Sequence, residues 1–462
     1  MSPENVPLSP PRPWAPRLSS PLVRLLLLGL LLLILQIPLY MIHGVVQERA
    51  ARRDEAVSDI LGKWGGRQSV AGPILYLPFL IRHRVADNGH GQPSEEVTAD
   101  AAYLLPQSLH VEVHLLAQRR HRGIFEVPVY SAALRLSGKF EPPDLGAWGV
   151  RSEDIDWKHA ALLINLAEPR TLQADAALDW GGHALRFSPS VGQGAWGVPG
   201  IHVPLGQLLP QVFEGGDSTF AVQLGFNGAD SLYLTPTAEQ TEVQMHSDWP
   251  HPSFQGSWLP VQYQAGDGGF DARWSVSYLG RDYPQRWRES ASFFGALPKS
   301  EFGVALAEPV DPYTMAERVI KYAVLTLLFT FAVIWLTEVL SARAVHPIQY
   351  AFIGAALCLF GLLQLSFAEH FGFTPAFIAA ALAVVALVTL YSRSLLPRAW
   401  QALAVGGILG CLYGYLYSIL RAEDHALLGG SVALFVGLAA AMYLTRKVDW
   451  HTLGRRVPET IS

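Results

Sequence analysis

The distribution of apolar residues along the chain divides it into three parts. A nearly uninterrupted apolar run covers Leu22–Ile42, and the chain becomes strongly apolar again after residue 318. A helix of about 21 residues, at ~1.5 Å rise per residue, is long enough to cross a ~30 Å hydrocarbon core. The first run exceeds the ~7–15 apolar residues of a signal peptide, and no small-residue cleavage site follows it. We therefore predict an uncleaved N-terminal transmembrane helix.

Five further apolar segments follow residue 318 and are joined by short connections. We predict five antiparallel transmembrane helices, at roughly Ile320–Leu340, Tyr350–Phe367, Pro375–Tyr391, Trp400–Leu420 and Ala426–Leu444. With the N-terminus in the cytoplasm, the inner segments carry ten Lys and Arg residues, whereas the two short outer loops carry only Arg421. This distribution follows the positive-inside rule. We expect both termini in the cytoplasm and the middle region in the periplasm of a Gram-negative bacterium.

These boundaries give five regions. We predict a cytoplasmic Pro/Arg tail at 1–21, a transmembrane helix at 22–42, a periplasmic domain at 43–318, a five-helix transmembrane bundle at 319–445 and a basic cytoplasmic tail at 446–462.

The middle region begins with a helical pattern and then changes to an alternating one. Apolar residues recur at helical spacing over 44–61, and Gly62 with Gly65-Gly66 is expected to end this juxtamembrane stalk. Beyond it, apolar and polar residues alternate, as strands require, at Leu109–Leu115, Phe125–Val129 and Phe220–Phe226. The pattern predicts a large β-rich domain of one or two sandwich-like or barrel-like lobes.

One hairpin is predicted in detail. Ala177–Phe187 alternates on both sides of Gly181-Gly182, and a two-residue glycine turn is typical of a tight hairpin.

Composition and charge exclude several classes of protein. Half of the 462 residues are apolar and 16% are charged, against ~25% charged residues in soluble domains, so a soluble enzyme is excluded. Residues 44–318 hold 22 Lys and Arg and 32 Asp and Glu, a net charge of −10, with no basic stripe for nucleic acid. The only cysteines, Cys358 and Cys411, lie in apolar segments, so the middle region has no disulfides.

Motif searches favour a protein without catalytic chemistry. The sequence has no P-loop, no dinucleotide-binding glycine motif, no H-E-x-x-H, no C-x-x-C and no nucleophile elbow. We therefore expect no catalytic residue, cofactor or resident metal. His110 and His114 lie on one face of a predicted strand and could bind a metal, but no carboxylate or cysteine at diagnostic spacing completes the site. A solvated polar face is the favoured interpretation.

Three clusters are candidate functional sites. A polar corner at the cytoplasmic end of the second helix comprises Glu338, Arg343, His346 and Gln349, with Glu338 expected to pair with Arg343 or His346 because charges at that depth are costly. An outer mouth is predicted from Gln364, Glu369, His370, Arg421 and Asp424. A rigid loop at 246–254, rich in aromatic residues and proline, offers Trp249, His251 and Phe254 as recognition residues, although capping a sandwich end is the favoured role.

The chain as a whole resembles the CreD family of bacterial inner-membrane, cell envelope integrity proteins. The resemblance covers nearly the whole chain except a proline-rich tail to about Ser20. It rests on these stretches: Glu48-Arg49-Ala50, Val70-Ala71-Gly72-Pro73, Ser247-Asp248-Trp249-Pro250-His251-Pro252-Ser253-Phe254, Lys321-Tyr322-Ala323, Glu338 with Arg343, His346-Pro347 and Gln349-Tyr350, Glu369-His370 with Gly372-Phe373, and Leu444-Thr445-Arg446 with Asp449-Trp450.

The resemblance implies a physiological setting and no mechanism. It implies a link to envelope stress and to the CreB/CreC two-component regulon, with no established catalytic residues. Our leading hypothesis is a non-enzymatic envelope-maintenance protein that sits in the lipid bilayer and binds an envelope protein or cell-wall component through its outer domain. The alternative is a small-molecule or ion transporter using the C-terminal bundle. A polar cavity reaching mid-membrane would favour transport, and a solid glycine-packed bundle would favour the first hypothesis.

Overall fold

The computed structural model describes residues 21–85, 94–173, 176–189, 199–206, 208–214, 216, 218–306, 311–341, 345–396, 398–421 and 426–446. Contacts within the chain separate two compact units. The helical unit comprises Met1–Arg52 and Val310–Ser462, and the outer domain comprises Arg53–Pro309.

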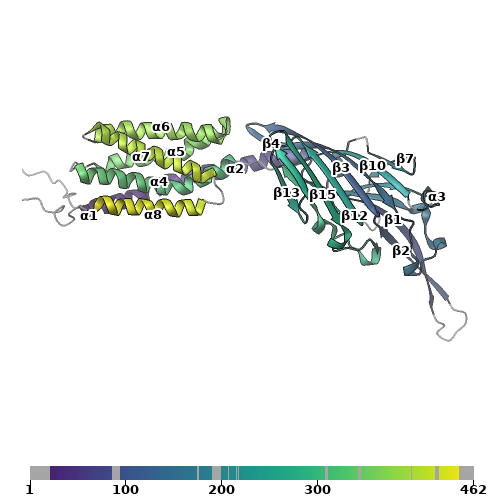
Figure 1. Ribbon diagram of the computed structural model, residues 1–462. Coiled ribbons are helices and arrows are strands. Elements are labelled where there is room, and N and C mark those ends of the chain that lie inside the picture. The colour runs from purple at the N-terminus through teal and green to yellow at the C-terminus, as the bar shows by residue number, and fades with distance from the viewer. Residues whose placement is uncertain are drawn as a thin grey trace, which may run out of the picture. The chain divides into compact units, whose positions relative to one another are not determined.

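The helical unit contains the predicted apolar segments as long helices (Figure 1). Consecutive helices from α4 to α8 contact one another, as short connections require, and α1 contacts α4 and α5. The helices are α1 (Pro21–Ile34), α2 (Gln36–Trp64), α4 (Pro312–Ser341), α5 (Pro347–Phe371), α6 (Phe373–Leu395), α7 (Ala399–Arg421) and α8 (Ala426–Thr445).

Within the described residues, five helices are long and apolar enough to cross a membrane. One is the continuous N-terminal segment Val23–Trp64, and the other four are α4 to α7. The apolar stretch of α8, Leu428–Ala439, is shorter than these five. The expected set of six spans is therefore supported for five of them, and the sixth stays a prediction.

The predicted end of the stalk at Gly62 needs correction. The helical stalk continues through Gly62 and ends at Trp64, followed by Gly65 with a φ of 113° that disfavours any other residue. In the bundle, close packing holds for Gly354, where an added Cβ would lie 2.3 Å from Leu35 Cδ1. Gly407 and Gly410 are not packed in this way, because no atom of the described residues lies within 4 Å of an added Cβ.

The outer domain consists of two β-sheets packed against each other (Figure 1). The first sheet runs β13-β17-β11-β1-β5-β9-β8, with β2 also paired to β1 and β16 to β2. Its strands are β1 (Gln68–Val85), β2 (Ser94–Leu104), β5 (Ala161–Leu166), β8 (Ser188–Pro189), β9 (Gly200–Pro204), β11 (Ser231–Thr235), β13 (Pro252–Gly256), β16 (Arg286–Arg288) and β17 (Phe302–Leu306).

The second sheet runs β14-β15-β12-β3-β4-β10-β6-β7. Its strands are β3 (Ser108–Arg122), β4 (Phe125–Phe140), β6 (Ala177–Trp180), β7 (His183–Arg186), β10 (Ser218–Ala229), β12 (Gln240–Ser247), β14 (Gln262–Gly266) and β15 (Gly269–Ser277). The predicted hairpin is confirmed as β6 and β7, and both of its turn glycines have positive φ, as a type I′ turn requires.

One hydrophobic core joins the two sheets, which settles the number of lobes. Leu75 and Leu162 of the first sheet and Val111, Leu134 and Trp274 of the second belong to the same buried cluster. The outer domain is therefore a single sandwich-like lobe. A smaller cluster covers the opposite face of the first sheet, because Ile74 and Tyr76 alternate with Leu75 along β1.

Candidate functional site

The polar corner is an ion pair between the first helix and the C-terminal bundle. Glu338, near the end of α4, is 6% exposed and accepts hydrogen bonds from Arg24 of α1 and from Tyr350 Oη of α5, the latter at 3.0 Å. A cavity of about 170 Å³ adjoins the pair. The corner therefore fixes three helices to one another.

The two predicted partners of Glu338 differ in outcome. Arg343 lies outside the described residues. His346 instead begins α5 as a capping residue: its Nδ1 accepts from the Ile348 amide at 3.3 Å, and its own amide donates to Gln349 Oε1 at 2.9 Å. Among the described residues no hydrogen bond or ion pair joins His346 to Glu338, so the pairing with His346 is corrected. The sequence signal for Arg24 was present, because it is an isolated cation at the start of an apolar run.

The outer mouth contains a second ion pair rather than an open polar site. The Glu369 side chain is 5% exposed and accepts two hydrogen bonds from the Arg49 guanidinium, with Arg49 Nε 2.9 Å from Oε1. Tyr313 Oη also donates to it at 3.0 Å. A bidentate guanidinium–carboxylate pair fixes geometry as well as charge. This pair, which lies where α2, α4 and α5 meet, is the feature that the sequence did not indicate.

The other predicted residues of the mouth do not meet there. His370 and Arg421 are exposed, Arg421 lying against the Tyr417 ring, and Asp424 lies outside the described residues. Gln364 is fully buried in α5, and neither side-chain polar atom has a partner among the described residues. Within the described part of the chain, no hydrogen bond or ion pair joins Gln364, Glu369, His370 and Arg421 to one another.

The predicted loop at 246–254 is largely built into the sandwich. Its first two residues end β12, and its last three begin β13. Trp249 is buried, and the Phe254 ring packs edge-on against Trp274 with 5.6 Å between centroids. Only His251 of the three recognition candidates is exposed. Trp249 is buried and Phe254 is half-buried against the core, which favours the structural role of this segment.

His110 and His114 belong to a polar face shared by neighbouring strands. The parallel pairing of β3 with β12 places Glu242 beside His110 and His246 beside His114. His246 Nδ1 lies 2.9 Å from Asp271 Oδ1 of β15. No group of three or more His, Cys, Asp or Glu side chains in the described residues could hold a metal ion. The solvated polar face is therefore the interpretation that the geometry supports.

This polar face forms the floor of a wide open groove of about 1290 Å³, which we call the β12 groove. The residues that lead into β14 form one of its walls. Its polar and aromatic lining includes Glu112, His114, Gln244, His246, Tyr263 and Arg273. The sequence did not indicate the β12 groove because β3 and β12 are more than 100 residues apart. Glu242, Gln244 and His246 nevertheless show the same polar–apolar alternation as His110 and His114.

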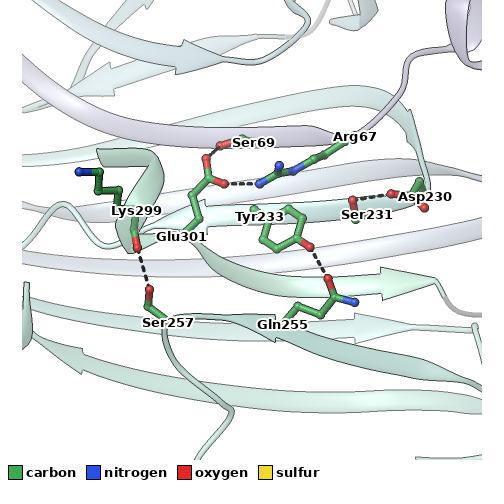
Figure 2. A network of polar contacts seen from close by, with 9 residues as sticks. All are labelled: Arg67, Ser69, Asp230, Ser231, Tyr233, Gln255, Ser257, Lys299 and Glu301. Atoms are coloured by element: carbon green, nitrogen blue, oxygen red, sulfur yellow. Dashed lines mark hydrogen bonds and ion pairs between the residues drawn. The ribbon is translucent and has the colours of Figure 1, made fainter. Parts of the chain in front are cut away.

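A second polar cluster lies on the first sheet (Figure 2). Glu301, which directly precedes β17, accepts hydrogen bonds from Arg67 and from Ser69 Oγ of β1. Nothing in the local sequence indicated this cluster, since Glu301 lies 232 or more positions from Ser69 and Arg67.

Comparison with known proteins agrees with the architecture. Residues 20–451 match the protein family described as "Inner membrane protein CreD". The chain is 30% identical to the inner membrane protein CreD of Escherichia coli (strain K12) over 427 residues, which cover 92% of each chain. Both findings, together with the apolar helices and the β-rich domain, show that this chain is a multi-pass inner-membrane protein that belongs to the CreD family.

Proposed function

We propose that this protein is a non-enzymatic binding protein of the bacterial cell envelope, which supports envelope integrity and an envelope stress response of the CreB/CreC-regulon type. In this proposal α8 is the sixth transmembrane span, and both termini are cytoplasmic. The outer domain faces the periplasm and binds an envelope protein or a cell-wall component.

The observation that carries this proposal is the β12 groove. It is open, wide and lined by side chains that can donate and accept hydrogen bonds, namely Gln244, His246 and Arg273. Concave surfaces with a few convergent polar groups are the usual binding sites of proteins. In our proposal the groove holds the envelope partner, without catalysis.

The packing of the helical unit supports a structural role for the bundle. Gly354 contacts Leu35 closely, and an added Cβ at Gly406 would lie 2.1 Å from Thr389 Oγ1. Small residues at such contacts are typical of tight helix packing in membranes. Ion pairs join Arg24 of α1 to Glu338 of α4 and Arg49 of α2 to Glu369 of α5. Both features favour a bundle that anchors the outer domain.

The proposal is tested by a matched pair of substitutions on the second sheet. Gln244→Arg places a bulky charge in the groove, and Gln223→Arg makes the same change at an exposed position of β10 outside it. We expect Gln244→Arg to fail to restore envelope resistance in a deletion strain, while Gln223→Arg restores it at equal abundance. A photoreactive residue at position 244, but not at 223, should crosslink to one discrete species. Full activity of both variants would refute the proposal.

One observation favours the transporter alternative. Among the described residues, neither the buried amide of Gln364 nor the buried hydroxyl of Tyr413 in α7 has a hydrogen-bond partner. Unpartnered polar groups inside a membrane bundle are costly and often mark a pathway. Gln364→Leu should then abolish function if the bundle transports a solute, whereas under the binding proposal it should preserve function and stabilise the bundle.

A further inference from the structure

A small cavity lies on the face of the first sheet that points away from the main core. The register pairs Ala71 of β1 with Thr235 of β11 and with Asn165 of β5. Residues paired in this way share one face, so these three side chains lie opposite the core-facing Val70 and Leu234. The cavity measures about 200 Å³.

The opposite wall of the cavity is apolar. It comes from the segment that precedes β17, including Phe294, Leu297 and Pro298, and from Pro199 before β9. The smaller hydrophobic cluster on this face holds Leu297 in place, with Phe294 packed against it. The cavity therefore has an apolar side and a polar side, as a site for an amphipathic ring requires.

Glu301 supplies the acceptor of the polar side. Its carboxylate is 8% exposed and lines the cavity together with Ser69, which donates to it. Arg67 also donates to Glu301, and its guanidinium stacks over the Tyr233 ring at 4.2 Å (Figure 2). An ionised carboxylate has about four acceptor positions, of which these bonds use two. Two positions are left for donors from a ligand.

Thr235 supplies a second observation that points to a ligand. It lines the cavity and is 4% exposed, and its Oγ1 has no hydrogen-bond partner among the described residues. Native proteins rarely bury a hydroxyl without a partner. A ligand hydroxyl in the cavity would satisfy it.

The charges of the site select a neutral ligand. Arg67 and Glu301 already form an ion pair, so the pair has no net charge, and a charged ligand would add an uncompensated charge to a largely apolar cavity. A hydroxyl group both donates and accepts, so a ring with several hydroxyls can donate to Glu301 and also pair with Thr235 and Asn165. A peptide amide offers one donor only.

We propose that this cavity, which is separate from the β12 groove, binds a single neutral monosaccharide ring. The hydroxyls face Glu301, Thr235 and Asn165, and an apolar face of the ring lies against Phe294. A volume of 200 Å³ corresponds to about seven water molecules at ~30 Å³ each, which suits one ring and is below the ~300–1000 Å³ of drug-sized pockets. The site assigns the outer domain a carbohydrate-binding activity in addition to its proposed partner binding.

The ligand class is tested with three related sugars, one neutral, one with an ammonium group in place of the 2-hydroxyl and one with a carboxylate at C6. Binding of glucose, glucosamine and glucuronate to the full-length protein in nanodiscs is measured by NMR saturation transfer and titration. We expect glucose to bind at least tenfold more tightly than the charged sugars. Maltose then shows whether the bound ring is a free sugar or part of a glycan. Binding equal to that of glucose indicates the end of a glycan chain, and loss of binding indicates a free monosaccharide. Equal binding of all three charge forms, or binding of only the neutral amide N-acetylalanine methylamide, would overturn the proposal.

The residues are tested with an internal control. Thr235→Val removes the hydroxyl at constant shape and should weaken glucose binding about tenfold. Thr237→Val removes another buried hydroxyl without a partner among the described residues, outside the cavity lining, and should leave binding unchanged. Ala71→Leu fills the cavity and should abolish binding. Gln244→Arg in the β12 groove should bind glucose normally, which separates this site from the proposed function. Unchanged binding in both Thr235→Val and Ala71→Leu would refute the site.

Discussion

The buried ion pair between Arg24 and Glu338 makes a quantitative prediction about the stability of the helical unit. Arg24→Ala leaves Glu338 buried, with Tyr350 as its remaining donor at 3.0 Å. Removing one member of a buried pair costs ~3–5 kcal/mol. The Arg24 side chain is 34% exposed, so solvent screening reduces this range, and we expect about 2 kcal/mol.

Removing both charges should cost less than removing Arg24 alone. Glu338→Gln keeps a group that can accept from Tyr350, and in the double variant no charge is buried. We expect the double variant to lose about 1 kcal/mol, so that the second substitution restores roughly half of the lost stability. The free energy of unfolding is measured by SDS titration in mixed micelles, for wild type, both single variants and the double variant.

A matched control comes from an exposed pair on α2. Arg52 and Glu48 form an i,i+4 ion pair with both side chains about 60% exposed, and Arg52→Ala should cost at most ~0.5 kcal/mol. If Arg24→Ala costs no more than Arg52→Ala, or if the two substitutions at the corner add independently, the corner is solvated and our account of it is wrong.

Three further predictions follow from the geometry. Arg49→Lys should lower the melting temperature of the detergent-solubilised protein, because lysine cannot form the bidentate pair with Glu369, and an Arg49→Lys melting temperature equal to wild type would contradict this. Gly406→Ala should destabilise the bundle by ~1–3 kcal/mol through overpacking against Thr389, whereas Gly407→Ala should be neutral, as measured by SDS titration. Hydrogen bonds, first from Arg82 and then from Arg151, hold the pKa of Asp154 below its usual value. The resulting stabilisation is complete above pH ~4 and is lost as pH falls through the lowered pKa, so Asp154→Asn should flatten the acid side of the stability profile measured by circular dichroism.

Local features of the fold could be predicted from the sequence. The turn at Gly181-Gly182 follows from two adjacent residues that tolerate positive φ, and apolar spans follow from composition alone. Whether a given residue faces the core, a neighbouring helix or the surroundings could not be predicted in the same way. Gly354 and Gly407 lie in similar apolar runs, yet only Gly354 meets a neighbouring helix. Trp249 gives the same sequence pattern whether its ring faces solvent or the core.

Contacts between residues far apart in the chain could not be predicted from the sequence either. Arg343 was the nearest cation to Glu338, and proximity in the chain made it the expected partner. In the structure Glu338 is bound by Arg24, which is 314 positions away, and the expected pairing with Arg343 lies outside the described residues. The same limit hid the pairing of β3 with β12 and the contact of Arg67 with Glu301, because nothing in the neighbouring sequence distinguishes these residues from other polar or charged positions.

The two ion pairs of the first helix also determine the order in which the protein can be assembled. Arg24 and Arg49 are synthesised 314 and 320 residues ahead of Glu338 and Glu369. At ~5–20 residues per second, translation needs roughly 15–60 s to reach the matching carboxylates. The whole outer domain is made within that interval. The outer domain can therefore begin to fold before the C-terminal helices have been synthesised. Those helices then pack against the N-terminal segment Val23–Trp64, which is made first.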